Sequence, residues 1–176
     1  MLRVRVSFSA PFMIAHILGN GPSRKDFINT PQGDIFGCNL SDPTLPLKAT
    51  FIMDKVVIGH IHNNKLKLNF PVIIPNSIRK LVNQCDPAPV ILDVMDPQLR
   101  PGESTGHRGV LWLMQNGYAE IHMWGFDSIK KDSVESDTHQ KIPESPFWTT
   151  NYKKWRVTWD KLLKGDDSKG VKVIIH

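Results

Sequence analysis

Short runs of apolar residues alternate along the chain with polar segments whose apolar residues lie three or four positions apart. The runs are predicted to form strands, and the spaced segments 76–82, 104–117 and 152–162 are predicted to form helices. Near-continuous apolar runs are typical of strands that are covered on both faces. We therefore expect an α/β fold, with a Rossmann-like, mainly parallel sheet and helices on both faces. The predicted strands are 2–8, 14–18, 34–39, 49–54, 71–75, 90–94, 120–127 and 171–175.

The first connection after such a run is rich in glycine. Gly19 and Gly21 flank Asn20, and a polar segment with spaced apolar residues follows. Glycine lets backbone N–H groups approach a ligand closely, and Ser23 is in position to cap the next helix. Because helix N-termini attract phosphate, the loop predicts a nucleotide or phosphate site. A tight structural turn explains the same residues equally well.

Length and charge narrow the class of protein. The 176 residues suit one domain, 1–176, and the net charge of +5 favours anionic partners. Nucleotides, anionic sugars, nucleic acid and a membrane surface all remain open. Two cysteines provide no disulfide framework, so a reducing cytoplasm is the expected setting. No apolar run approaches the roughly 18 residues of a membrane span.

Four blocks together resemble a known family. They are 19–23, 36–39, 104–106 opening a helix, and 120–127. Their order resembles bacterial sialyltransferases of the single-domain Rossmann type, glycosyltransferase family 42. It is also similar to related uncharacterised proteins, some from bacteriophages, and to the domain family that includes a 6-hydroxymethylpterin diphosphokinase. The matching blocks lie within residues 14–39 and 103–127.

The resemblance implies a small, metal-independent glycosyltransferase that needs no cofactor and uses a nucleotide-activated sugar, such as a CMP-linked one, as donor. It places the nucleotide at the carboxyl ends of the strands, where α/β sheets bind ligands. The implied nucleotide-binding residues are Gly19, Asn20, Gly21, Pro22, Ser23, Asn39, Ser104, Thr105, Gly106, Gly125, Phe126 and Asp127. Arg108, in the first turns of the predicted helix, is a candidate for clamping a phosphate, and a solvated helix residue is the alternative.

The resemblance also implies a catalytic base, His139, because a histidine follows the Gly-Phe-Asp block in the family. An imidazole with a pKa near 6.5 suits proton transfer from an acceptor hydroxyl. The family steadies the departing phosphate with tyrosines, whereas this chain has only Tyr118 and Tyr152, neither in the expected place. A non-catalytic nucleotide-binding protein is therefore an alternative.

A magnesium-dependent diphosphokinase or other phosphotransferase is a further alternative. It requires acidic residues that converge near the glycine loop, and Asp34, Asp42, Asp54 and Asp127 are the candidates. The chain has no Asp-x-Asp motif, which agrees with a metal-independent site. His60 and His62 share one face if residues 56–61 form a strand, and they could then hold a metal with Asp54. A short helix is equally compatible with those residues.

Basic and aromatic residues are interleaved near the end of the chain. Lys153, Lys154 and Arg156 lie among tryptophans, a composition that can stack nucleic-acid bases. However, Trp155 and Trp159 recur at helical spacing, which favours packing on the sheet. Nucleic acid is thus an open but not favoured partner. A homo-oligomer in which a neighbouring subunit supplies a lid is also open.

Overall fold

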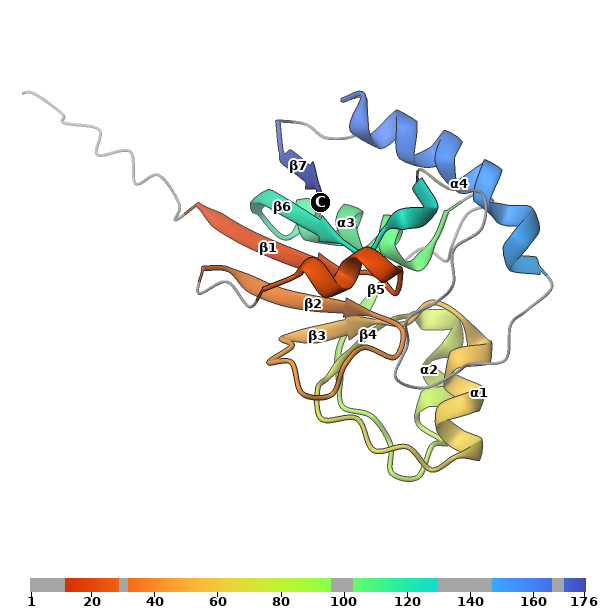
Figure 1. Cartoon of the computed structure of the whole chain (residues 1–176). Coiled ribbons are helices and arrows are strands. Elements are labelled where there is room, and N and C mark those ends of the chain that lie inside the picture. Colours follow the sequence, from red (N-terminus) through yellow and green to blue (C-terminus); the bar gives the residue numbers. More distant parts are fainter. Residues whose placement is uncertain (1–11, 29–31, 96–102, 130–146, 166–169) are drawn as a thin grey trace, which may run out of the picture.

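The computed structural model describes residues 12–28, 32–95, 103–129, 147–165 and 170–176, and the predicted strand 2–8 lies outside them. The described strands form one parallel sheet in the order β5-β4-β3-β2-β1-β6-β7 (Figure 1), so the predicted Rossmann-like α/β class is confirmed. The strands are β1 Met13–Leu18, β2 Asp34–Cys38, β3 Ala49–Phe51, β4 Val72–Pro75, β5 Ile91–Met95, β6 Tyr118–Trp124 and β7 Lys172–Ile175.

The helical elements follow most of the predicted spacing. Ser104 caps α3, because its Oγ accepts a hydrogen bond from the backbone N–H of His107 at 3.2 Å, and Gly117 ends it with a φ of 84°. The undecided segment 56–61 belongs to helix α1. The elements are η1 Pro22–Asp26, α1 Lys55–Asn63, η2 Asn76–Ile78, α2 Arg79–Val82, α3 Thr105–Gln115, η3 Asp127–Ile129 and α4 Phe147–Leu163.

Helices cover the sheet on both faces. Alternate residues of β1 show this arrangement, because Ile17 packs into the cluster formed with α3 and α4, whereas Leu18 packs on the opposite face. Helices α1 and α2 pack against β4 and against Ile52, which follows β3, and lie together at the end of the molecule opposite to α4 (Figure 1). Trp159 and Leu162 of α4 are fully buried, which confirms the packing predicted from their spacing.

The chain path defines a switch point at the carboxyl edge of the sheet. Strands β1 to β5 succeed one another outward, and the chain then returns through α3 to place β6 on the other side of β1. Leu18 and Trp124, the last residues of β1 and β6, are register partners. The loops that follow them therefore start side by side, at the position where α/β sheets bind ligands.

No helix in the described part of the chain is both long enough and apolar enough to cross a membrane.

Candidate functional site

The glycine loop after β1 packs directly on the loop after β6. The backbone N–H of Gly19 donates to the carbonyl of Trp124 at 2.7 Å, and that of Gly21 donates to the carbonyl of Gly125 at 2.8 Å. A Cβ on Gly19 would overlap the carbonyl oxygen of Gly125. Both glycines are therefore needed for a close approach of two backbones. Their N–H groups, expected to face a phosphate, bond to the neighbouring loop instead.

Ser23 contacts a carboxylate and does not cap a helix. Its backbone N–H and its hydroxyl both donate to Oδ2 of Asp127, at 3.1 and 2.9 Å. The short helix η1, which starts at Pro22, has Gly21 at its N-cap without a side-chain hydrogen bond, so the predicted capping by Ser23 is wrong. The negative charge that stabilises this end of η1 is supplied by the protein itself.

Two asparagines meet beside the glycine loop. Asn20 donates through Nδ2 to the carbonyl of Cys38 at 3.1 Å and accepts a bond from Arg24 at 3.4 Å. Asn39 follows β2 in the left-handed conformation, with a φ of 57°, and its N–H donates to the carbonyl of Phe51 at 2.8 Å. The side-chain oxygen of Asn39 is buried and accepts no hydrogen bond from any residue that the structure describes. The site thus contains an acceptor that a donor group of a ligand could satisfy.

The start of α3 completes the same edge. The hydroxyl of Thr105 donates to Oδ2 of Asp54 at 3.3 Å, and Asp54 follows β3. Burial raises the pKa of the Asp54 carboxyl, and the hydrogen bond from Thr105 opposes part of this effect. A Cβ on Gly106 would overlap the ring of Phe126, so this glycine is also required by close packing. The predicted blocks around 20, 39, 105 and 126 therefore converge at one sheet edge, although they are distant in sequence.

Arg108 is placed differently from the phosphate clamp that we considered. Its guanidinium lies 3.8 Å from the carboxylate of Glu103, and the side chain is 11% exposed. It also lines a pocket of about 200 Å³ between α3 and β5, whose wall includes Asp93 and Trp112. Arg108 thus lies beside β5 across this pocket, and its role as a phosphate clamp stays a prediction. His139 lies outside the described residues, so its predicted role as base stays a prediction.

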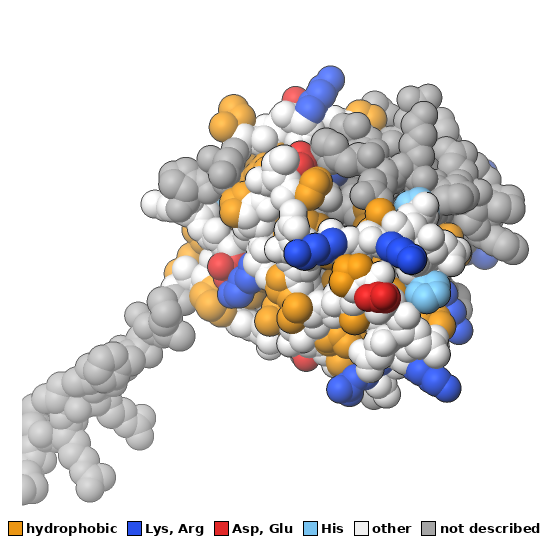
Figure 2. All heavy atoms as spheres, turned by 90° about the horizontal axis from the view of Figure 1, so that it is seen from below, with side chains coloured by type: hydrophobic (Ala, Val, Ile, Leu, Met, Phe, Trp, Pro, Cys, Tyr) orange, Lys and Arg blue, Asp and Glu red, His pale blue; other side chains and the backbone are white. Residues whose placement is uncertain are grey.

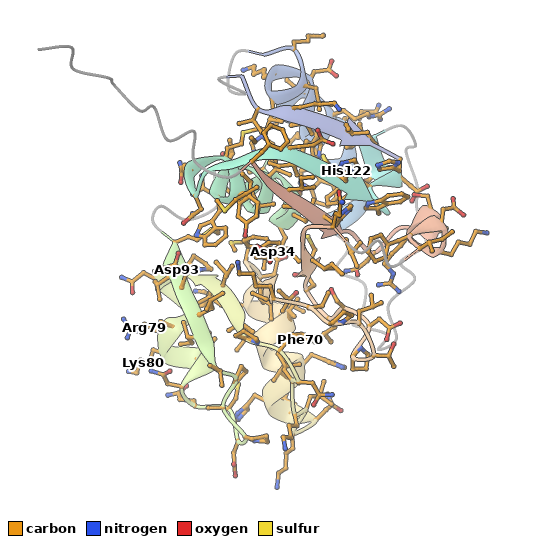
Figure 3. The ribbon with its side chains drawn as sticks, turned by 90° about the vertical axis from the view of Figure 1, so that its left-hand side faces the viewer. Asp34, Phe70, Arg79, Lys80, Asp93 and His122 are labelled. Atoms are coloured by element: carbon orange, nitrogen blue, oxygen red, sulfur yellow. The ribbon has the colours of Figure 1, made fainter. Side chains whose placement is uncertain are left out.

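The acidic residues proposed as a magnesium site do not converge. Asp34 begins β2 and lies at the amino ends of the strands (labelled in Figure 3), where it accepts bonds from Tyr118 at 2.5 Å and Lys48 at 2.7 Å. Asp54 and Asp127 follow the carboxyl ends of β3 and β6 at the opposite edge. Tyr118, which begins β6, is likewise far from the place where a leaving phosphate would need it.

The histidine pair considered as metal ligands is also separated. His60 and His62 lie two positions apart in helix α1, so they do not share a face as they would in a strand. Among the described residues, no group of three or more histidine, cysteine, aspartate or glutamate side chains could hold a metal ion.

Two features of the structure had a weak signal in the sequence. Asp54 was a candidate metal ligand only, although its position after a predicted strand could have marked it as a donor-site residue. His122 is hydrogen-bonded through both ring nitrogens, to Glu120 and His176, and is partly exposed. The cluster that it forms with His16 depends on strand order, which the sequence did not reveal.

Basic side chains are dispersed on the face that Figure 2 shows, where Lys and Arg lie among hydrophobic, acidic and polar side chains. Compared with protein-family models, with curated proteins and with solved structures, the chain matches none. The sheet order defines a Rossmann-like α/β protein, and its chemistry has to be argued from the side chains at the carboxyl edge.

Proposed function

We propose that this protein is a small, metal-independent transferase that uses a nucleotide-activated sugar as donor, similar to sialyltransferases. The donor would bind at the carboxyl edge of the sheet, over Asn20, Asn39 and the start of α3. The observation that carries the proposal is the convergence there of polar blocks from four separate parts of the sequence. A Rossmann-like sheet binds nucleotides at this edge in many proteins, so the location is consistent with its general chemistry.

The hydrogen-bond acceptors of the site favour a ligand that presents hydroxyl groups. The buried side-chain oxygen of Asn39 accepts no bond from the described residues, and an unsatisfied buried acceptor costs about 1–3 kcal/mol. Asp54 adds a second acceptor next to Thr105. Ribose and sugar hydroxyls are donors of the required kind, whereas a bare phosphate offers acceptors only. This pairing supports a sugar-bearing nucleotide as the ligand.

The start of α3 offers the complementary positive potential for the phosphate. Thr105 and Gly106 are the first residues of this 11-residue helix, whose first backbone N–H groups lack partners within the helix. These groups would attract a phosphate without a bound metal. The glycine loop is a less suitable cradle, because two of its N–H groups already bond to the β6 loop. A CMP-linked donor and His139 as base rest on the family resemblance.

Calorimetry and thermal shift with CMP, UMP, GMP, AMP and their nucleotide sugars test the donor site. We expect at least one of these ligands to stabilise the protein at millimolar concentration. Thr105→Val and Asn39→Ala should each weaken binding by about 2- to 150-fold, because a hydrogen bond to the ligand contributes about 0.5–3 kcal/mol. Thr158→Val and Asn63→Ala, which alter the same residue types elsewhere, are matched controls. Absence of stabilisation by every nucleotide, or equal binding in test and control variants, would contradict the proposal.

Turnover separates the transferase from the non-catalytic alternative. Release of the nucleotide from a bound nucleotide sugar, unchanged by a chelator, is the expected activity. His139→Ala should then abolish turnover while leaving nucleotide binding intact. Tight binding without turnover for any sugar acceptor or water would instead support a non-catalytic nucleotide-binding protein.

A further inference from the structure

Three histidines from neighbouring parallel strands form a stack on one face of the sheet. His16 of β1 and His122 of β6 are register partners, and His176 directly follows β7. The ring centroids are 4.9 Å apart for the first pair and 5.2 Å apart for His122 and His176. Trp124 stacks on His176 at 3.6 Å. His16 and His122 precede Gly19 and Gly125 by three residues each, but their rings stack on a face of the sheet, whereas the proposed donor site lies at its carboxyl edge (His122 is labelled in Figure 3).

The hydrogen bonds of His122 assign the protons in one half of the stack. Glu120 accepts a hydrogen bond from Nε2 of His122 at 2.7 Å and another from Nζ of Lys172 at 3.2 Å. Since an ionised carboxylate only accepts, His122 carries its proton on Nε2. When His122 is neutral, its Nδ1 accepts the proton of Nε2 of His176, 2.9 Å away. In this protonation state the chain of bonds links β7 to β6 through two neutral imidazoles.

His16 is held in its neutral form by different partners. Its Nε2 lies 2.9 Å from the carbonyl of Gln32 and donates to it, while its Nδ1 accepts from the indole N–H of Trp124 at 3.4 Å. A proton added to Nδ1 would face that indole N–H. Burial, together with the nearby His122, lowers the pKa of His16 despite the bond to the Gln32 carbonyl, which raises it, and the attraction of Glu120.

Protonation of His122 or His176 also disfavours the stacked arrangement. A second proton on His122 would meet the N–H that His176 directs at it. Burial and the neighbouring imidazoles also lower the pKa of His176. A histidine whose pKa is lower in the folded state contributes stability that is fully present above its unfolded pKa, near 6.5, and that is lost as the pH falls from there through the lower folded-state pKa. Among the described residues, Glu120 on β6 is hydrogen-bonded to His122, and Lys172 on β7 forms an ion pair with Glu120.

We propose that the stack of His16, His122 and His176 is a proton-sensitive clasp that fastens β7 to β6 at neutral pH and releases this strand in mild acid. Strand β7 is the element that responds, because it has four residues and, among the strands that the structure describes, lies at the edge of the sheet and pairs with β6 alone. The backbone N–H of His176 extends this pairing by donating to Met123 at 3.0 Å. Loss of the stack thus weakens one edge while β1 to β5 keep their packing.

Amide hydrogen exchange at pH 7.5 and 5.5, corrected for the intrinsic rate, tests the clasp. We expect the protection of β7 amides to fall relative to β4 amides, since protonation of the stack lowers the free energy of opening at this edge. His176→Phe keeps an aromatic ring on Trp124 but cannot take up a proton, so the pH dependence should become smaller in this variant and retain only the contributions of His16 and His122. His62→Phe, at an exposed site on α1, should behave as the wild type. Equal β7 protection at both pH values, or unchanged pH dependence in His176→Phe, would overturn the proposal.

Imidazole nitrogen chemical shifts of the wild-type protein give an independent measurement if His176→Phe fails to order β7. At pH 7.5 we expect the Nε2–H form of His16, His122 and His176, and His16 should titrate below the ordinary histidine pKa of about 6.5. Nδ1–H tautomers, or titration of His16 at or above that value, would refute the assigned hydrogen bonds and the clasp with them.

Discussion

Replacing Gly19 by alanine tests why the loop after β1 contains glycine. The added Cβ would overlap the carbonyl oxygen of Gly125 and lie 2.9 Å from its carbonyl carbon. Contacts between carbon atoms are optimal at about 3.5–4.0 Å, so the two loops must separate by roughly 1 Å. Both partners are backbone atoms, and no side chain can rotate away to relieve the overlap.

The cost follows from the bonds that this separation disrupts. The N–H bonds of Gly19 to Trp124 and of Gly21 to Gly125, at 2.7 and 2.8 Å, would lengthen beyond the useful range. Each contributes about 0.5–1.5 kcal/mol, and overpacking adds about 1–3 kcal/mol. We expect Gly19→Ala to lower the free energy of unfolding by about 2–6 kcal/mol, a large part of a total of about 5–15 kcal/mol.

Urea unfolding, followed by circular dichroism and tryptophan fluorescence, measures this change. With a slope of about 2 kcal/mol/M, the midpoint should fall by roughly 1–3 M. Gly59→Ala is the matched control, because a Cβ at Gly59 in α1 meets nothing within 4 Å, and it should be neutral or stabilising by up to about 1 kcal/mol. A Gly19→Ala protein as stable as the wild type that no longer binds nucleotides would refute the packing argument and assign the glycine to the ligand.

Three further predictions concern titratable side chains. Burial raises the pKa of Asp54, so its charge destabilises the folded state above a pH of about 4. Asp54→Asn should therefore raise the free energy of unfolding at pH 7, measured by urea unfolding, and should weaken nucleotide binding. Partial burial tends to raise the pKa of Asp34, but bonds from Lys48 and Tyr118 outweigh it and lower the pKa, so this carboxylate contributes stability that is lost as the pH falls below about 4. Lys48→Met should therefore move the midpoint of acid unfolding to higher pH. Because the Lys48–Asp34 ion pair is about half exposed, the substitution should lower the free energy of unfolding at pH 7 by less than about 1 kcal/mol. An unchanged midpoint would contradict the role of Lys48 in lowering the pKa of Asp34. Burial raises the pKa of the Cys38 thiol to about 12. A thiol reagent at pH 8 should therefore modify Cys38 only as fast as the protein opens. Rapid labelling under native conditions would disprove the burial of this side chain.

The strands could be predicted because burial on both faces requires apolar runs. The predicted strand at 34–39 became β2 at Asp34–Cys38, and the Ser104 start and Asn-Gly stop of α3 were visible in the sequence. Predicted strand 120–127 ended earlier, at Trp124, because Gly125 adopts a φ of 72° and turns the chain. Such local rules depend on neighbouring residues alone, so they are available before any tertiary contact is known.

The candidate site was predictable in location but not in detail. Residues that follow predicted parallel strands belong to one edge of the sheet, so Asn39 and Thr105 could be assigned to it in advance. The same rule assigns Asp34 to the opposite edge, because it begins a strand, and the four-acid magnesium site was inconsistent with it. The hydrogen-bond partner of each polar group could not be predicted from the sequence. Ser23 met Asp127 because β6 lies beside β1, a consequence of strand order.

By itself, the sequence determined the α/β class, the strand positions and the edge at which a ligand site would form, since each depends on periodicity over a few residues. Tertiary structure decided what those residues do there. It used Gly19 for contact between two loops, left the oxygen of Asn39 without a described donor, and brought His16, His122 and His176 into one stack. The physical reason is that hydrogen bonds and ring contacts depend on distances between atoms, which parallel pairing of strands remote in sequence establishes only after folding.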